Sequence, residues 1–523
     1  MNIKYIWLLL IFIGFIACED EDYTIPDNTV ELVPGSADFS NFVAVGNSLA
    51  AGFTDGALFQ AGQINSTPNI LAQKMALIGG GEFSQPYTND NIGGLLLGGT
   101  KIQDQRLYFD GSGPAYIDEE PTTEVSNVLA GPYNNMGVPG AKGFHLLANG
   151  YGNVAGVAGG QANPYFARMA SSPNASVMED VMAQNPTFFT LVIGENDVLS
   201  YAASGGDGIN QAGNFDPTTY GPNDITDPNV FAQVFGGLVS TLTSGGAQGV
   251  IANIPDVTTI PYFTTVPYKP LDPTNPDFGP QIPTLNAMFG QLNQAYAFLG
   301  VSERSIVFSQ TAASAVVIHD ESLADISAQL NQVLIGAGLD PLTAGLLSNQ
   351  FGQSRQATSD DLLVLPSMNM IGTLNNEYFN QLVSLGVPQE TAGQLSINGI
   401  TYPMRDKWVL LPSEQQEVIT AINLFNANIK MIADNAGLAF VDANALMAEL
   451  ATTGLSRGGY DFTSSLVLGG AFSLDGVHLT ARGYAMMANE MLEAIDATYG
   501  SNFKAAGELN DLGEFPAFYP KSF

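Results

Sequence analysis

Short apolar segments that are typical of buried β-strands alternate along this chain with segments of helical spacing. The predicted strands are residues 41–45, 188–193, 249–254 and 438–441. The predicted helices are residues 69–78, 229–243, 413–436 and 480–499. Parallel strands need crossover connections, and helical crossovers cover both faces of the sheet. The alternation therefore predicts an α/β fold with a parallel sheet between two layers of helices.

The helix predicted over 413–436 has the most regular apolar pattern. Its apolar residues repeat every three or four positions. We expect Ser413 to be the N-cap, Gln416 to complete a capping box, and Gly437 to end the helix.

Residues 264–410 interrupt the alternation of strands and helices. With 523 residues, the chain is long enough for one large domain or two ordinary ones. We interpret 264–410 as an insertion or cap beside the main sheet. Its apolar stretches within 323–372 would form either a lid over an acyl pocket or the core of the insertion. Residues 79–165 are rich in Gly, Asn and Pro, which predicts loops and short elements.

Charge and cysteine content limit the possible partners and sites. The net charge is −34, and such a surface repels nucleic acid phosphates, so we expect no nucleic-acid partner. The charged fraction is only 13%, so uncharged polar residues must supply much of the polar surface. Cys18 is the only cysteine, which excludes an internal disulfide and a cysteine-rich metal site.

The N-terminus has the features of an export signal. Lys4 precedes an apolar run over 5–16 that is short for a membrane-spanning helix, and Cys18 follows it. The segment 15–18 resembles a bacterial lipobox, so residues 1–17 are predicted to be a lipoprotein signal peptide and Cys18 the lipidation site. An ordinary signal peptide with an incidental cysteine is the alternative.

The residues after Cys18 are predicted to be an acidic tether over 18–40. Its first residues, 19–22 (EDED), resemble the surface-export signal of Bacteroidetes lipoproteins, although any solvated charge run has this composition. The lipobox and this signal together imply a cell-envelope protein, anchored in the outer membrane and surface-exposed. The main domain is then expected over 41–523.

One histidine lies in a sequence context typical of a serine hydrolase. Such an enzyme needs an exposed serine, a histidine that takes its proton, a carboxylate that orients the histidine, and donors for the oxyanion. The chain has three histidines: His145, His319 and His478. Only His478 has an aspartate, Asp475, three residues before it, whereas 319–321 is expected to be a polar loop. Asp475 and His478 are therefore the candidate carboxylate and base.

Three further residues lie where strands are predicted to end. Ser48 follows the strand 41–45 and would begin a helix, where backbone N–H groups favour a developing anion. Asn196 follows the strand 188–193, and its side-chain amide would be an oxyanion donor. Gly140, in a turn, would offer its N–H without steric hindrance. Taken alone, Ser48 is better explained as a helix cap and Gly140 as part of a plain turn, and Asn196 also fits an Asn-Asp turn.

Taken together, four segments in this order resemble the conserved blocks of SGNH hydrolases, also called GDSL esterases or lipases. The segments are 46–49 (GNSL), 135–140 (NMGVPG), 194–197 (GEND) and 475–478 (DGVH). The resemblance covers about 41–260 and 412–500. It implies a three-layer α/β/α sandwich with a flavodoxin-like, mostly parallel sheet of about five strands.

The resemblance also implies roles for individual residues. It makes Ser48 the nucleophile, His478 the base and Asp475 the orienting carboxylate. The oxyanion would be held by the N–H groups of Ser48 and Gly140 and by the amide of Asn196. Neither a metal nor an organic cofactor is implied.

Two positions need separate expectations. Asn47 replaces the aspartate that is usual before the nucleophile, and its amide keeps the shape and the hydrogen-bonding ability of that residue. Glu195 lies next to Asn196, where a carboxylate pointing inward would oppose the oxyanion. We therefore expect Glu195 to point to solvent or to a cation.

These residues leave three functions open. The first is a carboxylesterase or lipase that acts on acyl esters outside the cytoplasm. The second is a polysaccharide O-acetylesterase of the same mechanism. The third is a non-catalytic surface lipoprotein that binds a glycan or a lipid at a relict site.

Overall fold

A parallel five-stranded sheet forms the centre of the computed structural model, which describes residues 30–523. Its strands are β1 (Phe42–Gly46), β6 (Asn135–Gly137), β7 (Phe188–Val192), β8 (Gln248–Ala252) and β13 (Ala439–Val441). All four neighbouring pairs are parallel, in the order β13-β8-β7-β1-β6. Counted along the chain, this is the order 2-1-3-4-5 of flavodoxin-like doubly wound sheets.

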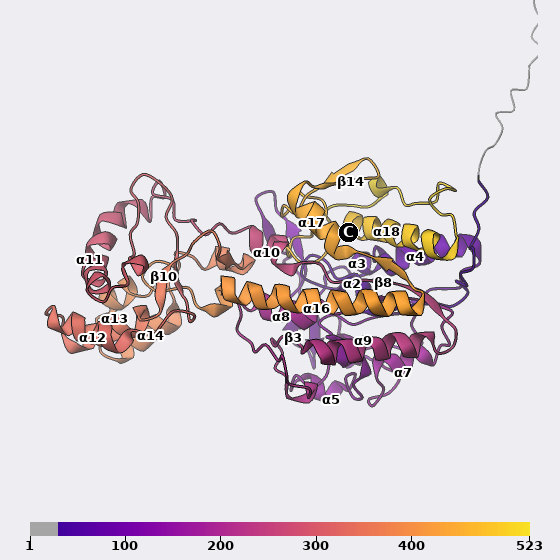
Figure 1. Ribbon diagram of the computed structural model, residues 1–523, viewed down its shortest axis with the longest axis horizontal. Helices are drawn as coiled ribbons and strands as arrows, with labels where there is room; N and C mark the ends of the chain where they lie inside the picture. Colours follow the sequence, from indigo (N-terminus) through magenta and orange to yellow (C-terminus); the bar gives the residue numbers. More distant parts are fainter. Residues whose placement is uncertain (1–29) are drawn as a thin grey trace, which may run out of the picture.

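Helices cover both faces of this sheet (Figure 1). On one side lie α4 (Thr67–Met75), α17 (Ala443–Thr452) and α18 (Ala481–Tyr499). On the other side lie α7 (Val177–Met182), α8 (Asn196–Ala203), α9 (Pro228–Thr243) and α16 (Pro412–Ala436). The predicted α/β class and the parallel sheet are therefore confirmed. The strands are almost continuously apolar because both faces of the sheet are buried.

Two elements of this frame differ from what the sequence predicted in detail. Strand β6 is one of the short elements expected within 79–165, but it was not predicted as a strand of the sheet, since its three residues carry no strand periodicity. Helix α16 begins at Pro412 rather than after Ser413, and Glu414, not Gln416, accepts the N–H of Leu411 at 2.7 Å. Proline suits the first helical position, where its missing N–H would have had no partner.

The N-terminal boundary of the folded part lies before residue 41. The N–H of Ser36 donates to Tyr499 O at 2.8 Å, and Phe39 is buried against Phe188. Phe39 therefore belongs to the core and Ser36 is bonded to the folded domain, although both were expected to be tether. The predicted signal peptide, Cys18 and residues 18–29 of the tether lie outside the described residues.

Residues between α10 (Pro261–Thr264) and α16 form a lobe with its own apolar core (Figure 1). Its helices are α11 (Ile282–Phe298), α12 (Ser327–Gly336), α13 (Pro341–Phe351), α14 (Asn376–Ser384) and α15 (Gln389–Gln394). Its short strands are β9 (Val317–His319), β10 (Ser354–Gln356), β11 (Leu362–Leu363) and β12 (Val409–Leu410). The polar loop expected at 319–321 is confirmed for 320–321 and is wrong for His319, which ends β9; Asp320 in this loop is buried and accepts a hydrogen bond from Arg355 at 2.6 Å.

The remaining elements are short and lie around the sheet. They include helices α2 (Ser48–Ala51), α3 (Gln60–Ile64), α5 (Val154–Val157) and α6 (Pro164–Ala167). Three hairpins pair β2 (Leu95–Leu97) with β3 (Thr100–Gln103), β4 (Leu107–Phe109) with β5 (Pro114–Tyr116), and β14 (Leu455–Arg457) with β15 (Tyr460–Phe462).

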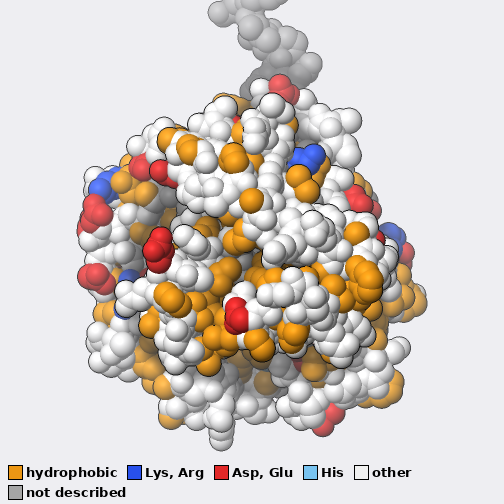
Figure 2. Space-filling model, turned by 90° about the vertical axis from the view of Figure 1, so that its left-hand side faces the viewer, with side chains coloured by type: hydrophobic (Ala, Val, Ile, Leu, Met, Phe, Trp, Pro, Cys, Tyr) orange, Lys and Arg blue, Asp and Glu red, His pale blue; other side chains and the backbone are white. Residues whose placement is uncertain are grey.

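The surface of the lobe agrees with the low charge content. Figure 2 shows hydrophobic side chains spread over this end of the molecule and few charged ones. Within residues 30–523, no helix combines the length and the apolar character that crossing a membrane would require.

Candidate active site

Three side chains from distant parts of the chain form a continuous line of hydrogen bonds. His478 Nε2 lies 2.8 Å from Ser48 Oγ, and His478 Nδ1 lies 2.8 Å from Asp475 Oδ2. Ser48 begins α2 directly after β1, whereas Asp475 and His478 lie in the loop before α18. This arrangement is the one in which a histidine takes the proton of a serine and a carboxylate fixes the histidine tautomer.

The sheet topology explains why Ser48 lies at an open edge. In the order 2-1-3-4-5, the chain leaves β1 and β7 in opposite directions, and ligands bind at such a switch point beyond the carboxyl ends of the strands. The ends of β1 and β7 approach each other closely, because a Cβ added at Gly46 would collide with Val192 O. Asn47 caps α2 by accepting the N–H of Leu49 at 2.9 Å.

Asp475 is held as a carboxylate by the loop around it. Its Oδ1 accepts the N–H groups of Val477 and His478 at 2.9 and 2.8 Å, and its Oδ2 accepts the N–H of Gly56 at 2.9 Å. Burial by itself would raise the pKa of Asp475, but the neighbouring His478 and these hydrogen bonds outweigh it and hold the pKa well below its ordinary value. The left-handed φ of +72° at Gly476 lets the loop bring the aspartate back onto the histidine.

Two of the expected oxyanion donors, Ser48 and Asn196, line one cavity, and Gly140 lies one residue before Ala141, which Asn196 contacts. Asn196 begins α8 after β7 and lines a cavity together with Ser48 and His478. Its Nδ2 donates to Ala141 O at 3.0 Å, which joins Asn196 to the turn at Gly140 and leaves its second amide hydrogen free. Within residues 30–523, the N–H groups of Ser48 and Gly140 have no hydrogen-bond acceptor. Three donors are therefore available for a developing negative charge.

Glu195 points inward, which contradicts the expectation that it would face solvent or a cation. Its Oε2 accepts the Nδ2 hydrogen of Asn47 at 2.6 Å, and both side chains are buried, at 6% and 1% exposed. Burial raises the pKa of Glu195 to about 7. The pair also explains the amide at position 47, because an aspartate there would set two buried carboxylates against each other.

Three residues that support the site carry no signal in the sequence. The ring of Phe53 packs on the imidazole of His478, with 4.6 Å between ring centroids. The hydroxyl of Ser473 donates to Asp475 at 3.1 Å, and Asp55 accepts the N–H of Leu474 at 3.0 Å. Burial raises the pKa of Asp55 to about 7. The contacts of Phe53 and Asp55 join residues more than 400 positions apart, so no local pattern predicts them.

A cavity of about 120 Å³ opens beside Ser48 and His478. Apart from the groups at its mouth, its lining is almost entirely apolar. It lies between the carboxyl ends of the strands and the helices α17 and α18, so the site combines a reactive hydroxyl with an apolar recess.

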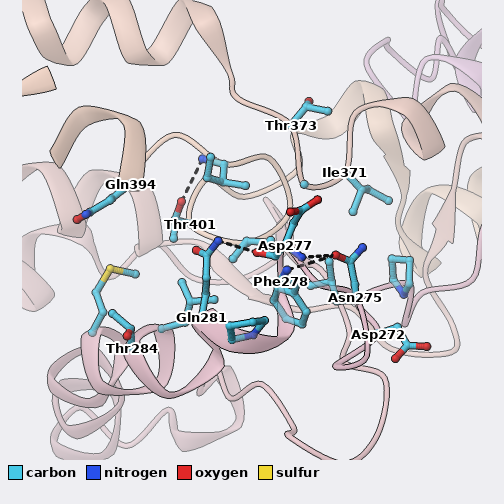
Figure 3. A pocket seen from close by; sticks show the side chains of 18 of the residues that line it. Asp272, Asn275, Asp277, Phe278, Gln281, Thr284, Ile371, Thr373, Gln394 and Thr401 are labelled. Atoms are coloured by element: carbon cyan, nitrogen blue, oxygen red, sulfur yellow. Dashed lines mark hydrogen bonds between the residues drawn. The ribbon is translucent and has the colours of Figure 1, made fainter. Parts of the chain in front are cut away.

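A larger cavity of about 790 Å³ lies in the lobe, away from the three hydrogen-bonded side chains (Figure 3). Gln281 and Thr284 at the start of α11 face Ile371 and Thr373 across it. Among the described residues that line this cavity there is no serine, cysteine or histidine. The hydrogen-bonded serine and histidine line the smaller cavity.

One group of side chains in the lobe has the donor set of a metal site. Among the described residues, His319, Glu321 and Asp406 place one ligand atom each within 4.8 Å of one another. Imidazole nitrogen and carboxylate oxygen are ligands for divalent transition metals. None of the three belongs to the site at Ser48.

Comparisons with protein-family models, with curated proteins and with solved structures find no match for this chain. The assignment of a function therefore rests on the sequence motifs and the geometry of the site.

Proposed function

We propose that this chain is a serine ester hydrolase of the SGNH type. The observation that carries the proposal is the hydrogen-bonded line Ser48–His478–Asp475 at the switch point of a parallel sheet. The free N–H donors at Ser48, Gly140 and Asn196 support it, because acyl transfer needs an oxyanion site beside the nucleophile.

The mechanism follows from the positions of the atoms. His478 Nε2 takes the Ser48 hydroxyl proton as Oγ attacks the ester carbonyl, while Asp475 holds the proton on Nδ1. The carbonyl oxygen becomes an oxyanion that accepts the three N–H donors. When the intermediate collapses, the C–O bond to the alcohol breaks, and His478 returns the proton to the leaving oxygen. Water, deprotonated by His478, then releases the acid from Ser48.

The test uses hydrolysis and covalent labelling together. We expect hydrolysis of 4-nitrophenyl acetate and labelling by a fluorophosphonate probe, both abolished in Ser48→Ala. Ser240→Ala is the matched control, because Ser240 is exposed on α9 and takes no part in the hydrogen-bonded line, and both hydrolysis and labelling should persist there. Full hydrolysis by Ser48→Ala would refute the site. A wild-type protein inert to both reagents would instead favour the non-catalytic lipoprotein.

We also propose that the chain is a lipoprotein of the cell envelope, anchored through Cys18. Metabolic labelling with an alkyne fatty acid should mark the wild-type protein and Ser48→Ala but not Cys18→Ala. Equal labelling of Cys18→Ala and the wild type, or no labelling of either, would refute the anchor.

A further inference from the structure

The cavity beside Ser48 is built from elements that meet only in the folded chain. Its apolar walls come from the segment after β8, from one face of α17, from the loop before α18 and from α18 itself. These apolar lining residues are Val257, Ile260, Leu446, Met447, Leu450, Leu455, Phe472 and Met486. Most of them are almost fully buried, so the recess extends into the core rather than along the surface.

Polar side chains in the lining are already paired within the protein. The Nδ2 of Asn253 donates to Asp442 at 2.8 Å, and its Oδ1 accepts the N–H of Asn444 at 2.9 Å. Asn47 and Glu195 bond to each other. Among the described side chains that line this cavity, the hydrogen-bonding groups left for a ligand are therefore those of Ser48, His478 and Asn196 and the second carboxyl oxygen of Glu195, all close to the nucleophile.

This distribution selects the chemistry of the occupant. A sugar ring would leave its hydroxyl groups without partners in the recess, and each unmade hydrogen bond is costly. A negatively charged group would find no counter-charge, because the described residues that line the cavity include no lysine or arginine. An alkyl chain has no hydrogen bonds to lose in this recess, and the burial of its methylene groups favours binding.

The dimensions of the recess limit the length of such a chain. A volume of about 120 Å³ corresponds to about four groups of the size of water or methylene, at roughly 30 Å³ each. The lining face of α17 runs from Ala443 to Leu450, seven residues or about 10 Å at 1.5 Å per residue. At the length of ordinary carbon–carbon bonds, about eight carbons in extended form cover that distance.

We infer that this cavity is the acyl-chain subsite and that it takes linear acyl groups of about four to eight carbons. The inference rests on the proposed hydrolase function. It assigns the subsite to α17 and α18 and not to residues 323–372, none of which lines the cavity. Several of those residues are buried in the core of the lobe, so of the two alternatives for this stretch the structure supports the core of the insertion.

The test is a series of 4-nitrophenyl esters from acetate to dodecanoate, assayed on the full chain. Each methylene that enters the recess should raise kcat/KM about fourfold, since its burial contributes about 0.8 kcal/mol. We expect kcat/KM to rise from acetate to an optimum between butanoate and octanoate, and to fall for the longer esters.

Two variants change the depth of the recess in opposite directions. Leu450→Phe fills the far end and should lower the ratio of kcat/KM for octanoate to that for butanoate about tenfold. Met447→Ala deepens the recess and should move the optimum to a chain two or more carbons longer. Ala448→Phe is the matched control, because Ala448 is exposed on the opposite face of α17, and it should keep the wild-type profile.

The outcomes separate the two proposals. A flat profile, or one highest at acetate, in a protein whose Ser48 reacts with the fluorophosphonate would overturn the acyl subsite and favour the acetylesterase. If kcat/KM rises along the ester series but the chain-length profile is the same in wild type, Leu450→Phe and Met447→Ala, the acyl group of the substrate binds in another recess, and the subsite assignment is overturned. Absence of hydrolysis and of labelling would overturn the hydrolase function itself, and the subsite with it.

Discussion

The buried pair of Asn47 and Glu195 makes the stability of the protein depend on pH in a defined way. The carboxyl of Glu195 accepts a hydrogen bond from Asn47 at 2.6 Å, and burial raises its pKa from an ordinary 4.5 to about 7. The folded chain therefore holds a proton between these values that the unfolded chain has lost. Unfolding free energy must then fall as the pH rises through this window, and stay lowered above pH 7.

The substitution Glu195→Gln removes this titration and keeps the shape. The Oε1 of the introduced glutamine can still accept from Asn47, and its amide replaces the neutral carboxyl. Each pKa unit corresponds to 1.36 kcal/mol, so the step from 4.5 to about 7 amounts to about 3 kcal/mol. We expect the variant to match the wild type within about 1 kcal/mol at pH 5, and to be more stable by about 2–3 kcal/mol at pH 8.

Urea unfolding followed by circular dichroism at pH 5 and pH 8 measures this difference. Other buried acids such as Asp55 and Asp197 also titrate, but they are common to both proteins and cancel when the two are compared at one pH. Glu82→Gln is the matched control, because Glu82 is exposed, and it should shift stability by under about 0.5 kcal/mol at either pH. If Glu195→Gln follows the wild type at both pH values, or is the less stable at pH 8, Glu195 is not held neutral by burial.

Three other substitutions test the groups around the serine. Asp475→Asn should lower kcat by roughly 10⁴-fold, because the histidine loses the partner that fixes its tautomer. A loss under tenfold in steady-state assays would mean that Asp475 is not the carboxylate that orients His478. In the same variant the unfolding free energy should depend less steeply on pH below about pH 4. The lowered pKa of Asp475 gives stability that is present above its ordinary value of 3.8 and is lost as the pH falls below that value. Asn196→Ala should lower kcat by about 10²–10³-fold with little change in KM, as expected for an oxyanion donor; an effect on KM alone would indicate a binding role. Gly476→Ala should cost about 1–2 kcal/mol in urea unfolding, because φ is +72° there and the new Cβ would lie 2.9 Å from Tyr262 N; an unchanged midpoint would mean that the loop adjusts freely.

The sequence alone was sufficient to predict the α/β class and the parallel sheet. Four of its five strands follow from apolar runs, because a strand buried on both faces has to be apolar along its length. Strand β6 could not be predicted in this way. It has three residues, Asn-Met-Gly, and Gly137 is there because a Cβ would collide with the backbone N of Ala51 in α2. That constraint comes from a helix more than 80 residues away.

The candidate site also has parts that the sequence predicted and parts that only the tertiary structure decided. The sequence placed Ser48, Asn196 and His478 at the ends of strands or before a helix, and the carboxyl ends of parallel strands must meet at one edge of the sheet. The inward direction of Glu195 was decided only in three dimensions, by the amide of Asn47 from the neighbouring strand end. The cavity was likewise decided by tertiary structure, because its walls come from segments up to 440 positions apart. Local periodicity reports whether a residue is buried, whereas the partner that it meets depends on how distant elements pack.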